Sequence, residues 1–365
     1  MKMTMAMMRS KPRVAVGMSG GVDSSVTVAR LLEQGYDVIG VTLDLLPKWA
    51  APEGENTAIR DAKRVAEKLG IQHYVLREQD FFEREVMLPF SESYAQGFTP
   101  NPCVNCNVKV KFGLLLEYAR SLGCEYLATG HYARLVQRDG QTYLSRPKDA
   151  RKDQTYFLWR VDPALLDSVL FPLADMCKTE TFRLAEELGL EVAHKPESQD
   201  ICFTCKLDHG EIVKHQCAEA TQPGNIIDEQ GNVRGTHSGL YQYTIGQRKG
   251  LGVGGLEKPY YVYKIDPVTN TVHIGPRELL EVSHIMASDA YMRLATLGEE
   301  ISCKVMLRYN MKPAEALVKL NEDHTLSIDL KEPAYGIACG QSAVCYREID
   351  GNDIVIGGGI ISCVD

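Results

Sequence analysis

Two short stretches of the sequence carry paired cysteines that could do chemistry. Thr99–Asn107 reads TPNPCVNCN and Glu197–Cys205 reads ESQDICFTC. Each stretch contains one C-x2-C pair, Cys103 with Cys106 and Cys202 with Cys205. Four thiolates in two such pairs could hold a structural zinc ion, although the gap between the pairs is long for a zinc knuckle.

Thiol chemistry is the alternative role for these cysteines. A thiolate is the nucleophilic form, and a helix start or a nearby cation lowers the pKa of a thiol. Cys106 directly precedes a helical pattern that carries Lys109 and Lys111, so the sequence predicts both conditions for Cys106. Replacing oxygen by sulfur on an activated carbonyl needs a sulfur donor, such as a persulfide, and a second thiol that frees the sulfur by forming a disulfide. Two distant cysteines fit this requirement.

A third stretch could bind phosphate. Gly17–Ser25 reads GMSGGVDSS and lies between a predicted strand and a predicted helix. Gly20 and Gly21 leave room for backbone N–H groups to close on an anion, the serines supply hydroxyl donors, and the helix start supplies positive potential. The loop lacks the glycine spacing and the lysine of a Walker A motif. It resembles the PP-loop of ATP pyrophosphatases, SGGxDS, which implies adenylation of a substrate with release of pyrophosphate.

The elements that must position these residues follow two patterns. Apolar runs alternate with helical periodicity in the first third of the chain, which predicts a parallel sheet covered on both faces, with ligands at the carboxyl ends of its strands. The predicted strands are Arg13–Met18, Asp37–Leu43, Gln72–Leu76 and Glu125–Thr129, and the predicted helices are Asp23–Gln34, Thr57–Leu69 and Lys109–Leu122.

After about residue 210 the pattern changes to glycine-rich turns and then to short strands. Ala314–Leu320 with Thr325–Leu330, and Ala343–Ile349 with Asp353–Ile356, read as hairpins of a small β-barrel. We therefore expect an α/β fold in three domains: a catalytic domain over 1–210, a central domain over 211–280 and a C-terminal β-barrel over 281–365.

Composition limits the location and the partners. No stretch approaches the roughly 18 apolar residues of a membrane helix, and the N-terminus has no secretory core, so we expect a cytoplasmic protein with reduced cysteines and no membrane contact. The net charge of -8 argues against nucleic-acid binding through bulk charge but allows a local basic face. The cysteines outside the two pairs are expected to be small buried hydrophobes: Cys124, Cys177, Cys217, Cys303, Cys339, Cys345 and Cys363.

Several motifs together resemble one family, the bacterial tRNA-specific 2-thiouridylases, which are PP-loop ATP pyrophosphatases. They stand in the family's order and span nearly the whole chain: SGGVDSS, TPNPCVNCN with VKVKF, ATGHYAR, KDQTYFLWR, SQDICF, HSGLYQYTIGQRKGLG and the pair Arg308–Tyr309. The resemblance implies that the enzyme adenylates O2 of uridine 34, the wobble base of tRNAs for Lys, Glu and Gln, and then installs sulfur there. It also implies ATP and Mg²⁺ as cofactors, and a sulfur-donor protein or sulfide as a partner.

The resemblance also assigns residues by motif. Cys106 would be the nucleophile and Cys202 the cysteine that receives the persulfide. ATP would be contacted by Gly17, Met18, Ser19, Gly20, Gly21, Val22, Asp23, Ser24, Leu43 and Gly130. Asn101, Pro102 and Cys103 would lie against the target base. Other tRNA contacts would come from His131, Lys152, Asp153, Gln154, Arg308, Tyr309 and Gln341.

The chain departs from the family pattern at two cysteines. Many relatives have aspartate at the position of Cys103, and Cys205 is an addition. Cys103, Cys106 and Cys202 could hold three corners of a [4Fe–4S] cluster whose open iron binds sulfide, because thiolates are the usual cluster ligands. The cluster route and the persulfide–disulfide route use the same residues, and the sequence leaves both open.

Basic residues offer a local surface for tRNA. Arg146–Arg160 holds five basic and two acidic residues with interleaved aromatics, which fits either phosphate contacts or a solvated face with core aromatics. Lys304, Arg308 and Lys312 form a second basic stretch, and Gly246–Gly252 is expected to contact tRNA or pack between domains. Two other functions remain open: a PP-loop ligase that forms a C–N bond, and a zinc-stapled tRNA-binding protein without catalysis.

Overall fold

A five-stranded parallel sheet forms the centre of the N-terminal part. The computed structural model describes residues 11–51, 56–195, 200–204, 207–254 and 258–364. The strand order is β3-β2-β1-β4-β7. The strands are β1 (Arg13–Gly17), β2 (Asp37–Asp44), β3 (Gln72–Arg77), β4 (Tyr126–Thr129) and β7 (Val169–Leu170). The predicted parallel α/β fold is therefore confirmed.

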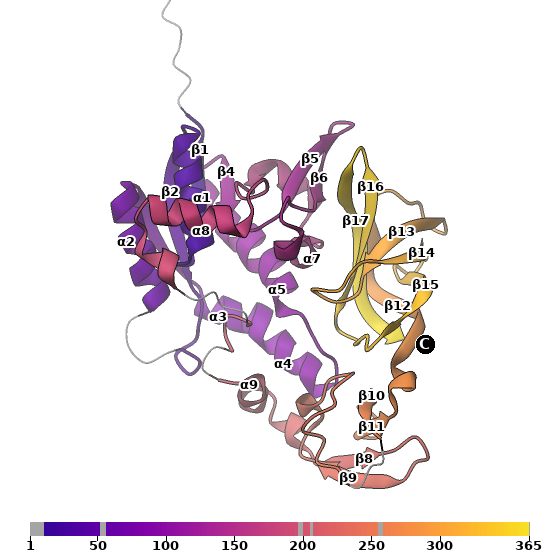
Figure 1. Ribbon diagram of the computed structural model, residues 1–365. Coiled ribbons are helices and arrows are strands. Elements are labelled where there is room, and N and C mark those ends of the chain that lie inside the picture. Colours follow the sequence, from indigo (N-terminus) through magenta and orange to yellow (C-terminus); the bar gives the residue numbers. More distant parts are fainter. Residues whose placement is uncertain (1–10, 52–55, 196–199, 205–206, 255–257, 365) are drawn as a thin grey trace, which may run out of the picture.

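Both faces of this sheet are covered because successive side chains of β1 point to opposite sides. Val14 and Val16 pack into an apolar cluster with residues of α1 (Val22–Glu33), α2 (Thr57–Leu69) and α8 (Lys178–Glu187). Ala15, between them, packs into a second cluster with α6 (Leu115–Ser121). Figure 1 shows α1, α2 and α8 grouped beside the sheet.

The stretch around the first cysteine pair differs from the single helix predicted over 109–122. It consists of α5 (Pro102–Asn105), the π-helix η2 (Cys106–Leu114) and then α6. A π-helix bonds residue i to residue i+5 and is frequent at functional sites. The helix therefore starts earlier than predicted, and Cys106 lies inside it rather than before it.

A helical layer links the sheet to the second cysteine stretch. It comprises α3 (Gln79–Phe82), the π-helix η1 (Glu83–Met87), α4 (Leu88–Ala95) and α9 (His209–Gln216). Phe82, Phe90 and Ile212 of this layer share one apolar cluster with Phe203. The short helices between the larger elements are η3 (Ala150–Lys152), α7 (Thr155–Leu158), η4 (Pro163–Ser168), η5 (Glu191–His194), η6 (Ala218–Thr221), η7 (Leu240–Gln242) and η8 (Arg277–Leu280).

A small four-stranded sheet follows in the central part, with strand order β10-β11-β8-β9. Its strands are β8 (Gly224–Ile227), β9 (Val233–His237), β10 (Tyr261–Asp266) and β11 (Thr271–Gly275). Val262, Val272 and Ile274 are fully buried in its core. Within the described part of the chain, no helix has the length and the apolar character that a membrane crossing needs.

The C-terminal strands close into a barrel, as predicted. The order β12-β15-β14-β13-β16-β17 is closed by an additional pairing of β12 with β17. The strands are β12 (Glu281–Met292), β13 (Glu300–Met306), β14 (Ala314–Leu320), β15 (Leu326–Tyr335), β16 (Ser342–Ile349) and β17 (Asn352–Val364). Both predicted hairpins, β14 with β15 and β16 with β17, are confirmed.

One hairpin from the N-terminal part joins this barrel sheet. β5 (Arg134–Arg138) and β6 (Gln141–Ser145) pair with each other, and β6 pairs with β17 at Ser145 and Ile354. In Figure 1 this hairpin reaches from the parallel sheet toward β16 and β17. The barrel and the parallel sheet are therefore joined by backbone pairing as well as by side-chain packing.

Candidate functional site

The residues predicted to contact ATP gather at one edge of the parallel sheet. Gly17 pairs in register with Val41 of β2 and with Thr129 of β4. The loop after Gly17, Leu43 at the end of β2 and Gly130 after β4 therefore lie at the carboxyl edge, where parallel sheets bind ligands. The structure brings these residues together, and their contact with ATP stays a prediction.

The loop conformation depends on two glycines. Gly20 has φ of 71°, and a Cβ there would lie 2.6 Å from the carbonyl oxygen of Ala58. A Cβ on Gly130 would lie 2.9 Å from the backbone nitrogen of Ser24. Any side chain at either position would force the loop away from its neighbours.

Side-chain hydrogen bonds fix the rest of the loop. The Ser24 hydroxyl accepts from the backbone N–H of Ser19 at 3.2 Å and donates to the carbonyl oxygen of Gly21 at 3.2 Å. Ser25 donates to the same carbonyl at 2.8 Å. Gly21 precedes the first turn of α1, so the positive end of that helix faces the loop.

Lys178 is a contact of the PP-loop that the sequence reasoning missed. Its Nζ donates to both carboxylate oxygens of Asp23, at 2.7 and 2.8 Å, and its side chain is 9% exposed. The Tyr132 hydroxyl donates to Asp23 Oδ1 at 3.1 Å. Lys178 is the first residue of α8, where a positive side chain opposes the helix dipole, and that unfavourable placement was the available signal.

The cysteine turn opens with a helix cap. The Asn101 side chain accepts from the backbone N–H of Cys103 at 3.2 Å, and Pro102 occupies the first helical position. Asn101, Pro102 and Cys103 therefore share the first turn of α5, and Cys106 begins η2 one turn later.

The predicted lowering of the Cys106 pKa is wrong. Burial raises the pKa of the Cys106 thiol to about 11, and Lys111 opposes this rise only in part. Burial also raises the pKa of Cys103. The helix start that should have lowered the pKa lies at Asn101, and Lys109 turns away to Glu85 at 4.0 Å.

Lys111 and His131 form a pair beside these thiols. Lys111 Nζ donates to His131 Nε2 at 3.1 Å, and His131 Nδ1 is 2.7 Å from the hydroxyl of Thr129. Because Nε2 accepts, the ring is neutral with its proton on Nδ1. Burial and the charge of Lys111 hold the pKa of His131 well below its ordinary value. His131, a predicted tRNA contact, is buried here.

Cys202 is exposed, and the residues on either side of it join the apolar cluster that Cys106 also contacts. Phe203 is 3% exposed and lies edge-on to Phe82 and Phe90, with ring centres at 5.8 and 5.1 Å. Ile201 and Cys106 both pack against this same cluster. The fold thus brings the Cys202 segment and the Cys106 helix to one apolar cluster.

The structure does not assemble a metal site from the paired cysteines. In the ranges described, no three side chains of His, Cys, Asp or Glu lie close enough to hold a metal ion. Cys103, Cys106 and Cys202 do not form a ligand set among the described residues, and Cys205 lies outside them. The donor types suit a cluster, but their arrangement here does not.

The lone cysteines are mostly buried, as expected. Cys124, Cys217, Cys303 and Cys345 are buried, whereas Cys177 and Cys339 are only partly covered. Cys177 is the cap residue of α8, which places it at the surface of that helix end. The side chain of Cys363 lies outside the described residues.

The basic stretch 146–160 is largely neutralised within the chain. Acidic partners lie within ion-pair distance of Arg146, Lys148, Arg151 and Arg160. Tyr156 and Trp159 are fully buried, so these two aromatics belong to the core rather than to a base-stacking surface.

Of the predicted tRNA contacts in this stretch, Asp153 and Gln154 have structural roles. Asp153 is buried, bonds Arg146 at 2.6 Å and accepts from the backbone of Thr155 at 2.9 Å. Gln154 accepts from the backbone N–H of Tyr132 at 2.9 Å. Lys152, in η3, is partly buried.

One of the predicted tRNA residues of the barrel, Gln341, contacts the cysteine turn. Gln341 Nε2 donates to the carbonyl oxygen of Thr99 at 2.7 Å, which ties the barrel to the start of TPNPCVNCN. The ring of Tyr309 lies 4.4 Å from that of Phe157, and Arg308 is exposed.

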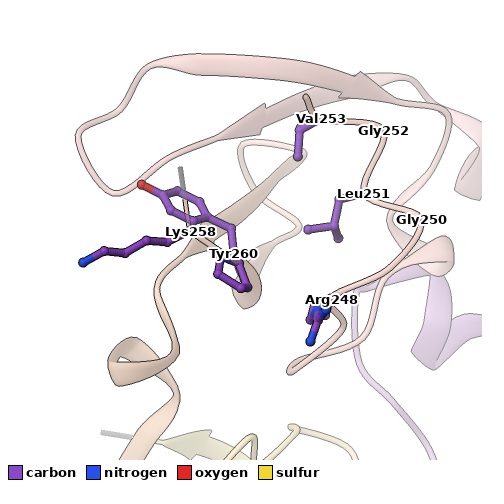
Figure 2. A pocket seen from close by; sticks show the side chains of 8 residues that line it. Arg248, Gly250, Leu251, Gly252, Val253, Lys258 and Tyr260 are labelled. Carbon is purple, nitrogen blue, oxygen red and sulfur yellow. The ribbon is translucent and has the colours of Figure 1, made fainter. Parts of the chain in front are cut away.

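A separate cavity of about 470 Å³ lies in the central part. Its walls include Arg248, Leu251, Val253, Lys258 and Tyr260 (Figure 2). It is formed by the loop expected to contact tRNA or pack between domains, and Gly246 of that loop approaches Gly336 of the barrel. The cavity contains none of the PP-loop or cysteine residues.

Family models of known proteins match this chain along most of its length. Three family models match in series: "tRNA methyl transferase HUP domain" over residues 12–206, "tRNA methyl transferase PRC-barrel domain" over 211–276 and "Aminomethyltransferase beta-barrel domain" over 282–361. The domain boundaries predicted at 210 and 280 stay predictions.

Curated relatives resemble this chain over almost the full length of both proteins. The tRNA-specific 2-thiouridylase MnmA of Clostridium perfringens is 42% identical over 96% of this chain and 99% of its own. That of Carboxydothermus hydrogenoformans is 43% identical over 96% and 98%. A solved structure of the U34-tRNA thiolase NcsA from Methanococcus maripaludis, with its [4Fe-4S] cluster, is 22% identical with a TM-score of 0.34, covering 56% of this chain and 65% of that one. That score is too low to bear on a cluster here. Given the identity and coverage of the named relatives, the chain belongs to the family of tRNA-specific 2-thiouridylases.

Proposed function

We propose that this enzyme replaces O2 of uridine 34 in tRNA by sulfur, using ATP. One observation carries the proposal: a PP-loop at the carboxyl edge of the sheet adjoins a cysteine helix, and the segment of a second, exposed cysteine packs against the same cluster as that helix. Adenylation and thiol chemistry then share one site. Both substrates occur in the cytoplasm, so a cytoplasmic location is part of the proposal.

The first step activates the base. The loop residues from Ser19 to Ser24 hold the pyrophosphate of ATP, with the positive end of α1 behind them. O2 of the uridine attacks the α-phosphorus, and pyrophosphate leaves. Mg²⁺, when bound, would shield the charge of the phosphates, and the carboxylate of Asp23, which here accepts from Lys178, is the kind of oxygen donor that this ion prefers.

The second step delivers sulfur through two cysteines. A donor protein that carries a persulfide transfers its terminal sulfur to the Cys202 thiolate and leaves as a thiolate, and the exposure of Cys202 suits this transfer. The terminal sulfur of the Cys202 persulfide attacks C2, the C2–O2 bond breaks, and AMP leaves with that oxygen and its electron pair. The Cys106 thiolate then attacks Sγ of Cys202. The persulfide S–S bond breaks, sulfur remains on C2, and a disulfide joins the two cysteines until an external thiol reduces it.

The base pocket and the tRNA set belong to the same proposal. Asn101, Pro102 and Cys103 form a turn that can face the uridine, and Arg308 of the barrel offers an exposed cation for the tRNA backbone. Uridine 34 of tRNAs for Lys, Glu and Gln is the proposed target. The [4Fe–4S] alternative requires the side chains of Cys103, Cys106 and Cys202 to converge. Among the described residues they form no group that could hold a metal ion.

Single-cysteine variants test the function. Cys106→Ser and Cys202→Ser should each abolish 2-thiouridine formation, while tRNA-dependent pyrophosphate release continues. The partly buried Cys177→Ser, at the cap of α8, is the matched control and should thiolate normally. A Cys106→Ser enzyme with full activity would favour a C–N-forming ligase, which needs no thiol.

The same preparations test the sulfur route. The anaerobically purified protein should contain no iron and should thiolate tRNA from a persulfide donor. Iron and sulfide in stoichiometric amounts, absent from the Cys103→Ser variant, would replace the disulfide route by the cluster route. One tightly bound zinc ion without any pyrophosphate release would support the non-catalytic tRNA-binding protein instead.

A further inference from the structure

Lys111 joins the cysteine helix to the end of β4, which in turn contacts the nucleotide loop. It belongs to η2, the π-helix that begins with Cys106, and its Nζ is 3.1 Å from His131 Nε2. His131 follows Gly130, whose Cα faces the backbone of Asp23 and Ser24 in the PP-loop. The end of β4 thus contacts the loop through Gly130 and the cysteine helix through His131.

The π-helix sets the relation between Lys111 and Cys106. Bonding from residue i to residue i+5 stacks position 111 over position 106, one turn further along the helix. The charge of Lys111 also acts on the pKa of both Cys103 and Cys106, against the effect of burial. Lys111 is therefore the lysine of this helix whose charge reaches the sulfur atoms.

The charge of Lys111 is not cancelled by its neighbours. Across the described ranges, no carboxylate forms an ion pair with it, and its hydrogen-bond acceptor is the neutral imidazole of His131. Phe112 and Phe171 flank that ring, with centres at 6.0 and 6.1 Å. Lys109, by contrast, is 57% exposed and faces Glu85. Lys109 therefore has the surroundings of an ordinary surface lysine, and Lys111 does not.

An uncancelled cation is useful where negative charge grows during a reaction. When sulfur attacks C2 and the C2–O2 bond breaks, the electron pair of that bond moves onto the departing AMP. Its phosphate changes from a diester with one negative charge to a monoester with more. A fixed cation stabilises such a developing charge more than it stabilises the ground state.

We propose that Lys111 stabilises the negative charge that passes from the attacking sulfur to the departing AMP, and that Thr129 and His131 hold its ammonium group in place. This inference rests on the proposed function, because it assigns a residue to the second of its two steps. Lys111 has no part in the first step, in which O2 attacks ATP.

The test separates the two steps in the full-length enzyme. Lys111→Met keeps the length of the side chain and removes its charge. It should release tRNA-dependent pyrophosphate within about threefold of the wild-type rate, whereas its rate of 2-thiouridine formation falls about 100-fold, the effect of removing one charge-stabilising group. Lys111→Arg should recover at least about tenfold of that decrease, because it restores the charge.

Lys109→Met is the matched control, two residues away on the same helix, and should thiolate normally. Thermal unfolding of all three variants shows whether they fold like the wild type. A Lys111→Met enzyme that thiolates normally, or that folds normally but loses pyrophosphate release and thiolation in parallel, would overturn the inference and leave the proposed function standing. A wild-type enzyme that does not thiolate tRNA would overturn both.

Discussion

At the scale of single residues, the site keeps Cys106, His131 and Asp23 in neutral or paired forms, whereas no carboxylate among the described residues pairs with Lys111. Cys106 is a thiol because burial outweighs Lys111, His131 is a neutral imidazole, and Asp23 is paired with Lys178. A resting enzyme of this kind protects its thiol from oxidants, because the thiolate is the reactive form.

The neutral state of His131 predicts a dependence of stability on pH. Its pKa in the folded protein lies well below the ordinary value of 6.5, so below about pH 6.5 the unfolded chain binds a proton that the folded chain does not. Stability is therefore full above that pH and declines as the pH falls, by up to about 1.4 kcal/mol per pH unit.

Chemical denaturation at about pH 7.5 and about pH 5.5 measures this decline. His131→Asn removes the titrating ring, so the variant should lose less stability over this range than the wild type. His73, His237 and His273 also have lowered pKa values, and they titrate equally in both proteins. Equal declines in the two proteins would refute the assignment.

The sequence was informative about residues where local chemistry decides the outcome. A phosphate loop needs Gly20, Gly21 and Ser24 in a fixed order, and that order is visible in one stretch. The pKa of Cys106 depends on burial by distant segments, which no local pattern reveals. The partnership of Asp23 with Lys178 joins residues far apart in the chain, so only the fold shows it.

At the scale of elements, the cysteine turn is held from outside by a loop of the barrel. The backbone N–H of Thr99 donates to the carbonyl oxygen of Cys339 at 2.8 Å, and Gln341 donates to the carbonyl oxygen of Thr99 at 2.7 Å. Gly340 lies between these two contacts with φ of 94°. The loop thus fixes the chain four residues before Cys103.

Gly340→Ala should disturb this contact. A Cβ there would lie 3.0 Å from the carbonyl carbon of Thr99, so the turn or the loop must move. Small displacements at a reacting group can reduce rates strongly, and we expect thiolation to fall about tenfold or more. The measurement is the rate of 2-thiouridine formation beside the melting temperature.

Gly351→Ala is the control for backbone strain. Gly351 also has a positive φ, 74°, but no atom lies within 4 Å of its added Cβ. Both variants should lose about 1–2 kcal/mol of stability from the left-handed backbone. If thiolation falls equally in both, strain in the barrel and not contact with Thr99 controls the turn.

Most elements of the parallel sheet and the barrel hairpins could be predicted because periodicity and turn residues define them. The π-helix from Cys106 was not predicted, because the helical patterns sought had the roughly 3.6-residue period of an α-helix. The hairpin of β5 and β6 was also missed as a barrel partner. Its pairing with β17 depends on a contact between segments more than half the chain apart.

At the scale of the whole molecule, the N-terminal part and the barrel are interlocked around Trp159. This side chain is 1% exposed, and its Nε1 donates to the Ser342 hydroxyl at 2.9 Å. Its ring would be 3.0 Å from a Cβ on Gly358, and it stacks on Tyr291 at 5.7 Å. Arg146 adds ion pairs to Asp153 and to Asp353 of the barrel.

This interlock predicts that the two parts unfold together. The sequence contains two tryptophans, so Trp49→Phe leaves Trp159 as the sole fluorescent reporter of the interface. In that variant the denaturant curves from Trp159 fluorescence and from far-ultraviolet circular dichroism should coincide, as for a cooperative transition. A fluorescence change at clearly lower denaturant would mean that the interface opens while both parts stay folded.

The charge of the whole molecule sets the last expectation, which concerns tRNA. The chain is acidic overall, and most basic residues of the stretch 146–160 form ion pairs with acidic residues of the same chain. We therefore expect tRNA binding to rely on exposed cations outside that stretch, and Arg308 is one of them. Removing one cation that binds a phosphate reduces the slope of log affinity against log salt by about 0.7–0.9.

Arg308→Ala should show this decrease and weaker binding at low salt, measured by fluorescence anisotropy over a salt series. Arg183→Ala, which removes an exposed arginine of α8 paired with Glu187, should leave the slope unchanged. If the two variants behave alike, the barrel does not supply the phosphate contact, and the loop at Arg248 becomes the surface to test next.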